Sequence, residues 1–153
     1  MKLQRLIQHG ADAGVRQRAL RKLLWARIEQ EGLTDDVLQA VLASGDSQVQ
    51  RALVSVEQKA ALSFEHLQRL LEAGATENVR RCALRELLLR RLETEELSDG
   101  LFERVLAFPD RHAQLALLAL PGLTPKQAER LAERGSSRRV RSRARSRLRA
   151  MRS

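Results

Sequence analysis

Small and apolar residues recur along this chain in a fixed pattern. A six-residue segment with alanine in second place occurs five times, at residues 18–23, 51–56, 82–87, 115–120 and 143–148. Its alanines, Ala19, Ala52, Ala83, Ala116 and Ala144, are 33, 31, 33 and 28 residues apart. Such a period is typical of a stacked repeat array. Because positions i and i+4 share a helix face, each copy is predicted to be a helix, with alanine where another backbone comes close.

A second apolar pattern precedes each copy, with the spacing i, i+3, i+4 of an amphipathic helix. It is formed by Leu3, Leu6 and Ile7; Leu38, Val41 and Leu42; Leu67, Leu70 and Leu71; Phe102, Val105 and Leu106; and Ala128, Leu131 and Ala132. A helix-ending residue follows each time: Gly10, Gly45, Gly74, Pro109 and Gly135. We expect these glycines to adopt the left-handed cap. Each unit is therefore predicted to be a helix, a tight turn and a second helix.

Polar residues at the starts of these helices are predicted to be caps. Thr34, Ser63, Ser98 and Thr124 open the first helices, and Pro125 fits a first helical position. The second helices are opened by Asp12, Asp46, Thr76, Asp110 and either Ser136 or Ser137. A longer repeat also exists, because residues 3–56 align without gaps to residues 67–120, with 25 of 54 positions identical. A pair of units was therefore duplicated, and a fifth unit follows.

The motif Val-Arg-x-x-Ala-Leu-x-x-Leu, seen at residues 15–23, resembles HEAT repeats of the short bacterial kind. The resemblance implies an all-α fold: a right-handed α-solenoid of five repeats and about ten helices in one domain, residues 1–153. The repeats would span approximately residues 1–32, 33–61, 62–96, 97–122 and 123–153, with a basic closing helix at about 137–152. The resemblance also implies that Asp46 and Asp110 pair with arginines of neighbouring units, and that the second helices line a concave, contact-making face.

The composition bounds the class of protein. With 43% hydrophobic but only 3% aromatic residues among 153, the core must consist mainly of leucine, valine and alanine, which suits helix packing. No apolar run is long enough to span a membrane, and the N-terminal residues lack the apolar stretch of a signal peptide. We therefore predict a cytoplasmic protein without a membrane partner. The single Cys82 cannot form an internal disulfide and is expected to be a small, buried or half-buried residue.

Candidate catalytic chemistry is sparse. His9, His66 and His112 lie in three different units, and no pair has the i, i+4 spacing of a helical metal site. We find no glycine-rich phosphate loop and no nucleophile beside a sequence-visible base. DNA glycosylases built from HEAT-like repeats hold damaged bases with aromatic residues, and this chain has few. We therefore expect no enzymatic activity, cofactor, bound metal or small-molecule substrate.

Charge carries the clearest functional signal. No acidic residue follows Glu133, and nine arginines do: Arg134, Arg138, Arg139, Arg141, Arg143, Arg145, Arg147, Arg149 and Arg152. Subtracting these nine from the 28 basic residues leaves 19, equal to the 19 acidic ones, so residues 1–133 are neutral and the net charge of +9 lies at the C-terminus. Val140, Ala144, Leu148 and Met151 form an apolar stripe within the same segment. Arginines without acids repel one another, which favours an anionic partner.

Two functions follow. The first is a non-catalytic binding scaffold whose nine C-terminal arginines engage an anionic partner, either the backbone of RNA or DNA or an acidic protein surface. The concave face implied by the resemblance would add further contacts, from Arg16, Arg21, Arg80, Arg81 and Arg85. The second is a protein–protein adaptor that grips a peptide or helix in its groove, with the basic helix only a soluble cap. The neutrality of residues 1–133 favours this second function. We expect Arg141, Arg145 and Arg149 to face solvent.

Overall fold

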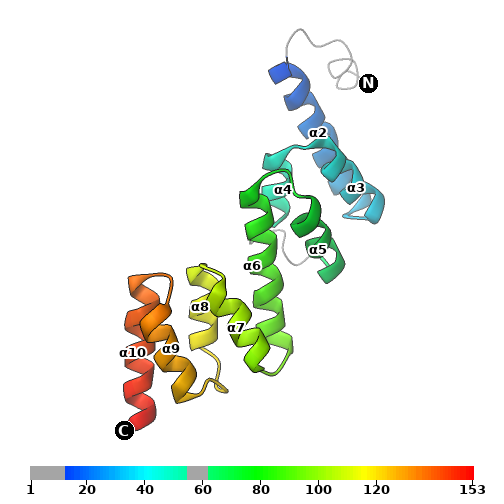
Figure 1. The fold of residues 1–153 in the computed structure, drawn as a ribbon. Helices are drawn as coiled ribbons and strands as arrows, with labels where there is room; N and C mark the ends of the chain where they lie inside the picture. The colour runs from blue at the N-terminus through cyan, green and yellow to red at the C-terminus, as the bar shows by residue number, and fades with distance from the viewer. Residues whose placement is uncertain (1–12, 55–61) are drawn as a thin grey trace. The chain divides into compact units, whose positions relative to one another are not determined.

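The computed structural model describes residues 13–54 and 62–153, and these ranges contain nine α-helices and no strand (Figure 1). The helices are α2 (Ala13–Glu31), α3 (Asp35–Ser44), α4 (Ser47–Leu53), α5 (Phe64–Ala73), α6 (Glu77–Thr94), α7 (Asp99–Ala107), α8 (Arg111–Leu118), α9 (Pro125–Arg134) and α10 (Arg138–Arg152). The all-α prediction is confirmed over this part of the chain. The first predicted helix with its apolar triplet, Gly10, the Asp12 cap, His9 and the end of the 51–56 segment lie outside the described residues.

The helix starts follow the predicted capping chemistry. Thr34, Ser63, Ser98 and Thr124 each accept a hydrogen bond from the backbone N–H three residues later. Asp46 and Asp110 cap α4 and α8, Thr76 and Ser137 bond the first turns of α6 and α10, and Pro125 begins α9. These contacts satisfy N–H groups that a helix leaves without an internal partner, so the local sequence sets each boundary.

Glycines end these helices for two different reasons. Gly45 has φ 66°, the left-handed cap that the sequence predicts. At Gly74 and Gly135 φ is −56° and −53°, so the predicted left-handed conformation is wrong there. What these two positions require is space. A Cβ at Gly135 would lie 2.7 Å from both the carbonyl oxygen of Leu131 and Cγ1 of Val140, and Gly74 has the same surroundings.

The chain forms two compact units, Met1–Glu86 and Leu87–Ser153, and α6 runs across the boundary between them. In the second unit, α7 packs on α8 and α9 packs on α10, while α7 also contacts α9 and α8 contacts α10. The unit is therefore two layers: the first helices α7 and α9, and the second helices α8 and α10. In the first unit, α3 contacts α5 and α2 contacts α4, which gives the corresponding two layers.

A buried glutamine joins consecutive helix pairs in each unit. Gln114 of α8 is fully buried; its Nε2 donates to the carbonyl oxygens of Leu106 (3.2 Å) and Phe108 (3.1 Å) at the end of α7. Its Oε1 accepts from the N–H of Ser136, 2.8 Å away in the turn before α10. Gln50 of α4 is equally buried and makes the matching bonds, to the carbonyl of Val41 and from the N–H of Ala75. One side chain thus binds its own pair to the next.

The burial of the five repeated alanines depends on the length of the helix that carries them. Ala19, Ala83 and Ala144, on the long helices α2, α6 and α10, are buried, as predicted. Ala52 and Ala116, on the short helices α4 and α8, are half-buried. On α4 the buried stripe is instead formed by Val49, Gln50 and Leu53. The tight helix contact predicted at Ala52 is therefore only partly present, because Gln50 takes the central buried position.

Replacing Gln114 with leucine should destabilise the protein. The change keeps the side-chain volume but leaves the N–H of Ser136 and the carbonyls at the end of α7 without partners, at about 1–3 kcal/mol. Urea denaturation measures the loss. Gln48→Leu on the exposed face of α4 is the matched control and should stay within about 0.5 kcal/mol of the wild type. Equal stabilities of the two variants would contradict this role.

Replacing Ala83 with leucine should overpack a fully buried position, at about 1–3 kcal/mol. The same change at the exposed Ala150 of α10 is the control, because it adds equal volume in solvent. Thermal unfolding followed by circular dichroism compares the two. An unchanged melting temperature for Ala83→Leu would mean that this site can expand freely.

Candidate anion-binding surface

The C-terminal arginines fall into three groups in the structure. Arg138, Arg139, Arg143 and Arg145 of α10 are exposed, and their side chains form no hydrogen bond or ion pair within the described residues. Arg134, also exposed, lies at the end of α9. The predicted solvent exposure of Arg145 is confirmed, and the anion-binding role of all five arginines stays a prediction.

Other arginines of α10 hold the fold together. Arg141 is half-buried and donates from Nη1 to the carbonyl oxygen of Gly135 at 2.8 Å. Arg147 donates to the carbonyls of Leu118 and Leu120 at the C-terminal end of α8. The prediction that Arg141 faces solvent is therefore wrong, because its guanidinium satisfies the carbonyl left open where α9 ends.

The remaining two C-terminal arginines make surface contacts. Arg149 donates to Oγ of Ser146 at 3.2 Å, one turn back on α10, and remains exposed. Arg152 pairs with Glu129 of α9. Exposed ion pairs of this kind contribute little to stability, so both arginines can exchange these contacts for an anionic ligand.

A further ion pair lies between the first helices of the second unit. Arg130 of α9 binds Glu103 of α7. The hydrogen bond from Arg130, helped by the charges of Arg130 and Arg134, lowers the pKa of Glu103. The carboxylate of Glu103 is thus neutralised by an arginine of the neighbouring first helix.

The arginines expected on a concave face also divide into two groups. Arg21 binds Asp46, with Nε 2.7 Å from Oδ2, and Arg80 donates to the carbonyl of Gly74 at 2.8 Å. These two stabilise the first unit. Arg16 and Arg81 are exposed, and Arg85 is half-buried with Nη2 3.8 Å from the half-buried Sγ of Cys82.

Charge separates by layer in the second unit. The second helices carry nine arginines, Arg111 on α8 and eight on α10, and no acid. The first helices are balanced: α7 and α9 together hold four acids (Asp99, Glu103, Glu129 and Glu133) and four bases (Arg104, Lys126, Arg130 and Arg134). One layer of this unit is therefore strongly basic while the other is neutral.

The first unit shows the same tendency. Helices α2 and α4 hold six bases and two acids, whereas α3 and α5 hold one base and four acids. The equal numbers of bases and acids over residues 1–133 therefore do not mean that each layer is neutral.

A hollow of about 350 Å³ lies in the basic layer, between α8 and α10 of the second unit. Its lining residues are Leu115, Leu118, Ala119, Arg143, Ser146 and Arg147. Arg111 lies one turn before Leu115 and Arg139 one turn before Arg143, so both share the faces that border the hollow. Sequence reasoning missed Arg111 and Leu115. The available signal was a leucine in the slot that holds Arg18, Arg51 and Arg143 in other copies.

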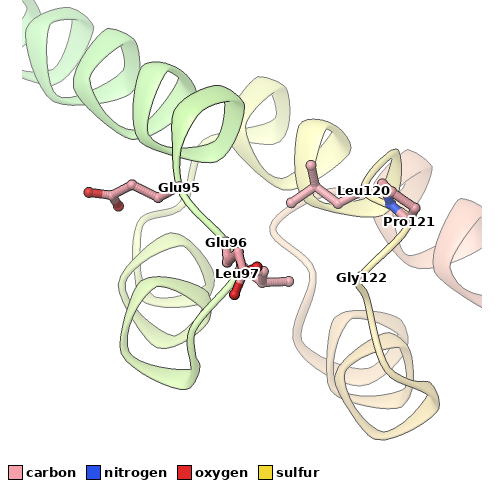
Figure 2. A pocket seen from close by; sticks show the side chains of 6 residues that line it. All are labelled: Glu95, Glu96, Leu97, Leu120, Pro121 and Gly122. Carbon is pink, nitrogen blue, oxygen red and sulfur yellow. The ribbon is translucent and has the colours of Figure 1, made fainter.

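A second hollow, of about 400 Å³, lies where α6 leads into α7 and α8 into α9 (Figure 2). It is lined by Glu95, Glu96, Leu97, Leu120, Pro121 and Gly122. Figure 2 shows the side chain of Glu95 pointing away from this space, and its carboxylate is 2.9 Å from Nε of Arg91. The lining thus combines two carboxylate side chains with the apolar Leu97, Leu120 and Pro121.

The described residues also bear on a metal site and on a membrane-spanning helix. Residues 13–54 and 62–153 contain no cluster of three or more histidine, cysteine or carboxylate side chains that could hold a metal ion. His66 acts in a cap, where Nδ1 accepts from the N–H of Ser63 at 3.3 Å. Within the same ranges, each helix is too short or too polar to cross a membrane.

Comparison of the chain with protein-family models, with curated proteins and with solved structures gave no match.

Substituting Asp46 with asparagine should isolate the charge of a buried carboxylate. Burial alone would raise the pKa of Asp46, but hydrogen bonds from the N–H of Val49, from Arg21 and from Gln17 together hold it below its usual value. Asparagine is also a good cap, so the variant loses mainly the pairing with Arg21, at about 1–3 kcal/mol near neutral pH.

The pH dependence follows from the direction of that shift. A depressed folded-state pKa means that the stabilisation is complete above the unfolded pKa of about 4 and is lost as the pH falls through the folded value. The stability gap between wild type and Asp46→Asn should therefore shrink below about pH 4. Denaturant unfolding between neutral and acidic pH measures it. A gap that stays constant into acid would contradict the paired carboxylate.

Proposed function

We propose that this protein is a non-catalytic helical-repeat binding scaffold that engages an anionic partner through its second helices. The partner is either the phosphate backbone of a nucleic acid or an acidic protein surface. The arrangement implied by the HEAT-like resemblance, five pairs in a right-handed solenoid acting in the cytoplasm, is part of this proposal.

The observation that carries the proposal is the separation of charge between layers. In the second unit nine arginines and no acid lie on α8 and α10, while α7 and α9 are neutral. A soluble terminal cap needs polar residues of either sign, and mixed charges would repel less. Placing one sign on one layer raises the local concentration of anionic ligands there, which supports a binding role.

The choice of basic residue supports the same conclusion. All nine bases of this layer are arginine, whose planar guanidinium forms paired hydrogen bonds with phosphate or carboxylate. Several of them, including Arg111, Arg139 and Arg143, are exposed and form no hydrogen bond or ion pair within the described residues. The adaptor alternative, with an inert basic helix, does not account for this availability.

Removing charge from one layer at a time tests the proposal. The triple variant Arg111→Gln, Arg139→Gln, Arg143→Gln should weaken binding to duplex DNA, RNA and polyglutamate. It should also reduce the salt slope for DNA by up to about three counterions. The control carries three equivalent changes on α7 and α9: Arg104→Gln, Lys126→Gln and Arg130→Gln.

Titration at low and near-physiological salt compares the two variants with the wild type. We expect the control to retain most of the affinity, because it lowers the net charge equally without touching the basic layer. If both variants lose the same amount of affinity, net charge alone explains the binding and the basic layer has no special role. Failure of the wild type to bind any of the three polyanions would remove the proposed function.

A further inference from the structure

The hollow between α8 and α10 is unusual because its floor is apolar within a basic layer. Leu115 and Leu118 of α8 and Ala119, which caps it, form one side, and Arg143, Ser146 and Arg147 of α10 form the other. Leu115 is half-buried, and Ala119 is exposed. A site for phosphates alone does not need this apolar surface.

The position before the repeated alanine holds arginine in three of the five copies. Arg18, Arg51 and Arg143 are exposed there, and Cys82 of α6 is half-buried. In α8 the same position holds Leu115. Leu115 is half-buried and adds apolar surface where three other copies have a guanidinium group.

Arginines border this apolar floor. Arg111 and Arg139 are exposed and form no hydrogen bond or ion pair within the described residues, and each lies one helical turn from a lining residue. The guanidinium of Arg147 is bonded to the carbonyls of Leu118 and Leu120, so it fixes one wall and is not free to bind a ligand. Neither α8 nor α10 carries a carboxylate that would compete for an incoming anion.

Resting on the proposed function, we propose that this hollow binds a short acidic segment of a partner protein. One apolar side chain of that segment enters against Leu115 and Leu118, and flanking carboxylates pair with Arg111, Arg139 and Arg143. The arginines favour a segment with carboxylates, and the apolar floor favours a segment with an apolar side chain between them. A nucleic-acid backbone supplies charge but no such side chain, and none of the six lining residues is aromatic to stack a base.

Two acidic peptides that differ at one position test this inference. Both are glutamate-rich, and a central leucine in one is serine in the other. The wild type should bind the leucine peptide about tenfold more tightly, because part of a leucine side chain leaves water. Duplex DNA is the third probe.

The variant Leu115→Arg should change the affinities for the two kinds of partner in opposite directions. It introduces the residue type of three other copies, so it should remove the preference for the leucine peptide while strengthening DNA binding. Ser142→Arg adds the same charge at an exposed position of α10 outside the hollow, and should keep the preference. Ala119→Trp fills the hollow without changing charge and should also remove the preference. Circular dichroism confirms that each variant is folded.

The outcomes distinguish failure of the docking site from failure of the proposed scaffold function. A wild type that binds both peptides and DNA without preferring leucine overturns the hollow as a docking site but leaves the scaffold function standing. Tighter binding of the leucine peptide by Leu115→Arg than by wild type overturns it as well. If no polyanion binds at all, both proposals fail together.

Discussion

The stacking of helix pairs depends on a buried amide. Gln50 and Gln114 each lie fully buried on a short second helix, and each bonds the end of the preceding helix and the turn before the next second helix. An amide suits this place because it both donates and accepts, so it satisfies carbonyl and N–H groups at once. A hydrocarbon side chain would pack but leave those groups unpaired, at a cost that packing does not recover.

The same turns decide which arginines are free. Where α5 and α9 end, Gly74 and Gly135 leave no room for a side chain, and the carbonyl of each accepts a hydrogen bond from Arg80 or Arg141 of the next helix. These arginines belong to the fold although the sequence places them in a basic run. The arginines whose side chains remain available are neighbours on the same helix, such as Arg139 and Arg143, which point into solvent.

Charge on this chain has to be considered layer by layer. Along the sequence, first and second helices alternate, and acids and bases are equal in number over residues 1–133. Within the second unit, packing places alternate helices in different layers: α8 and α10 carry nine arginines and no acid, while α7 and α9 are balanced. This separation of charge is the basis of the proposed binding surface, one part of which, the hollow at Leu115, is apolar.

The sequence by itself determined the helices and most of their boundaries, because both are local. Apolar spacing of three and four residues defines a helix face, and a cap such as Thr124 or Asp110 reaches only three residues along the chain. The tertiary structure alone decided the burial of Gln114, the bonded state of Arg141 and the partition of charge between layers. Each of these depends on groups brought together from different helices, whose hydrogen bonds and contacts form only when the helices pack side by side.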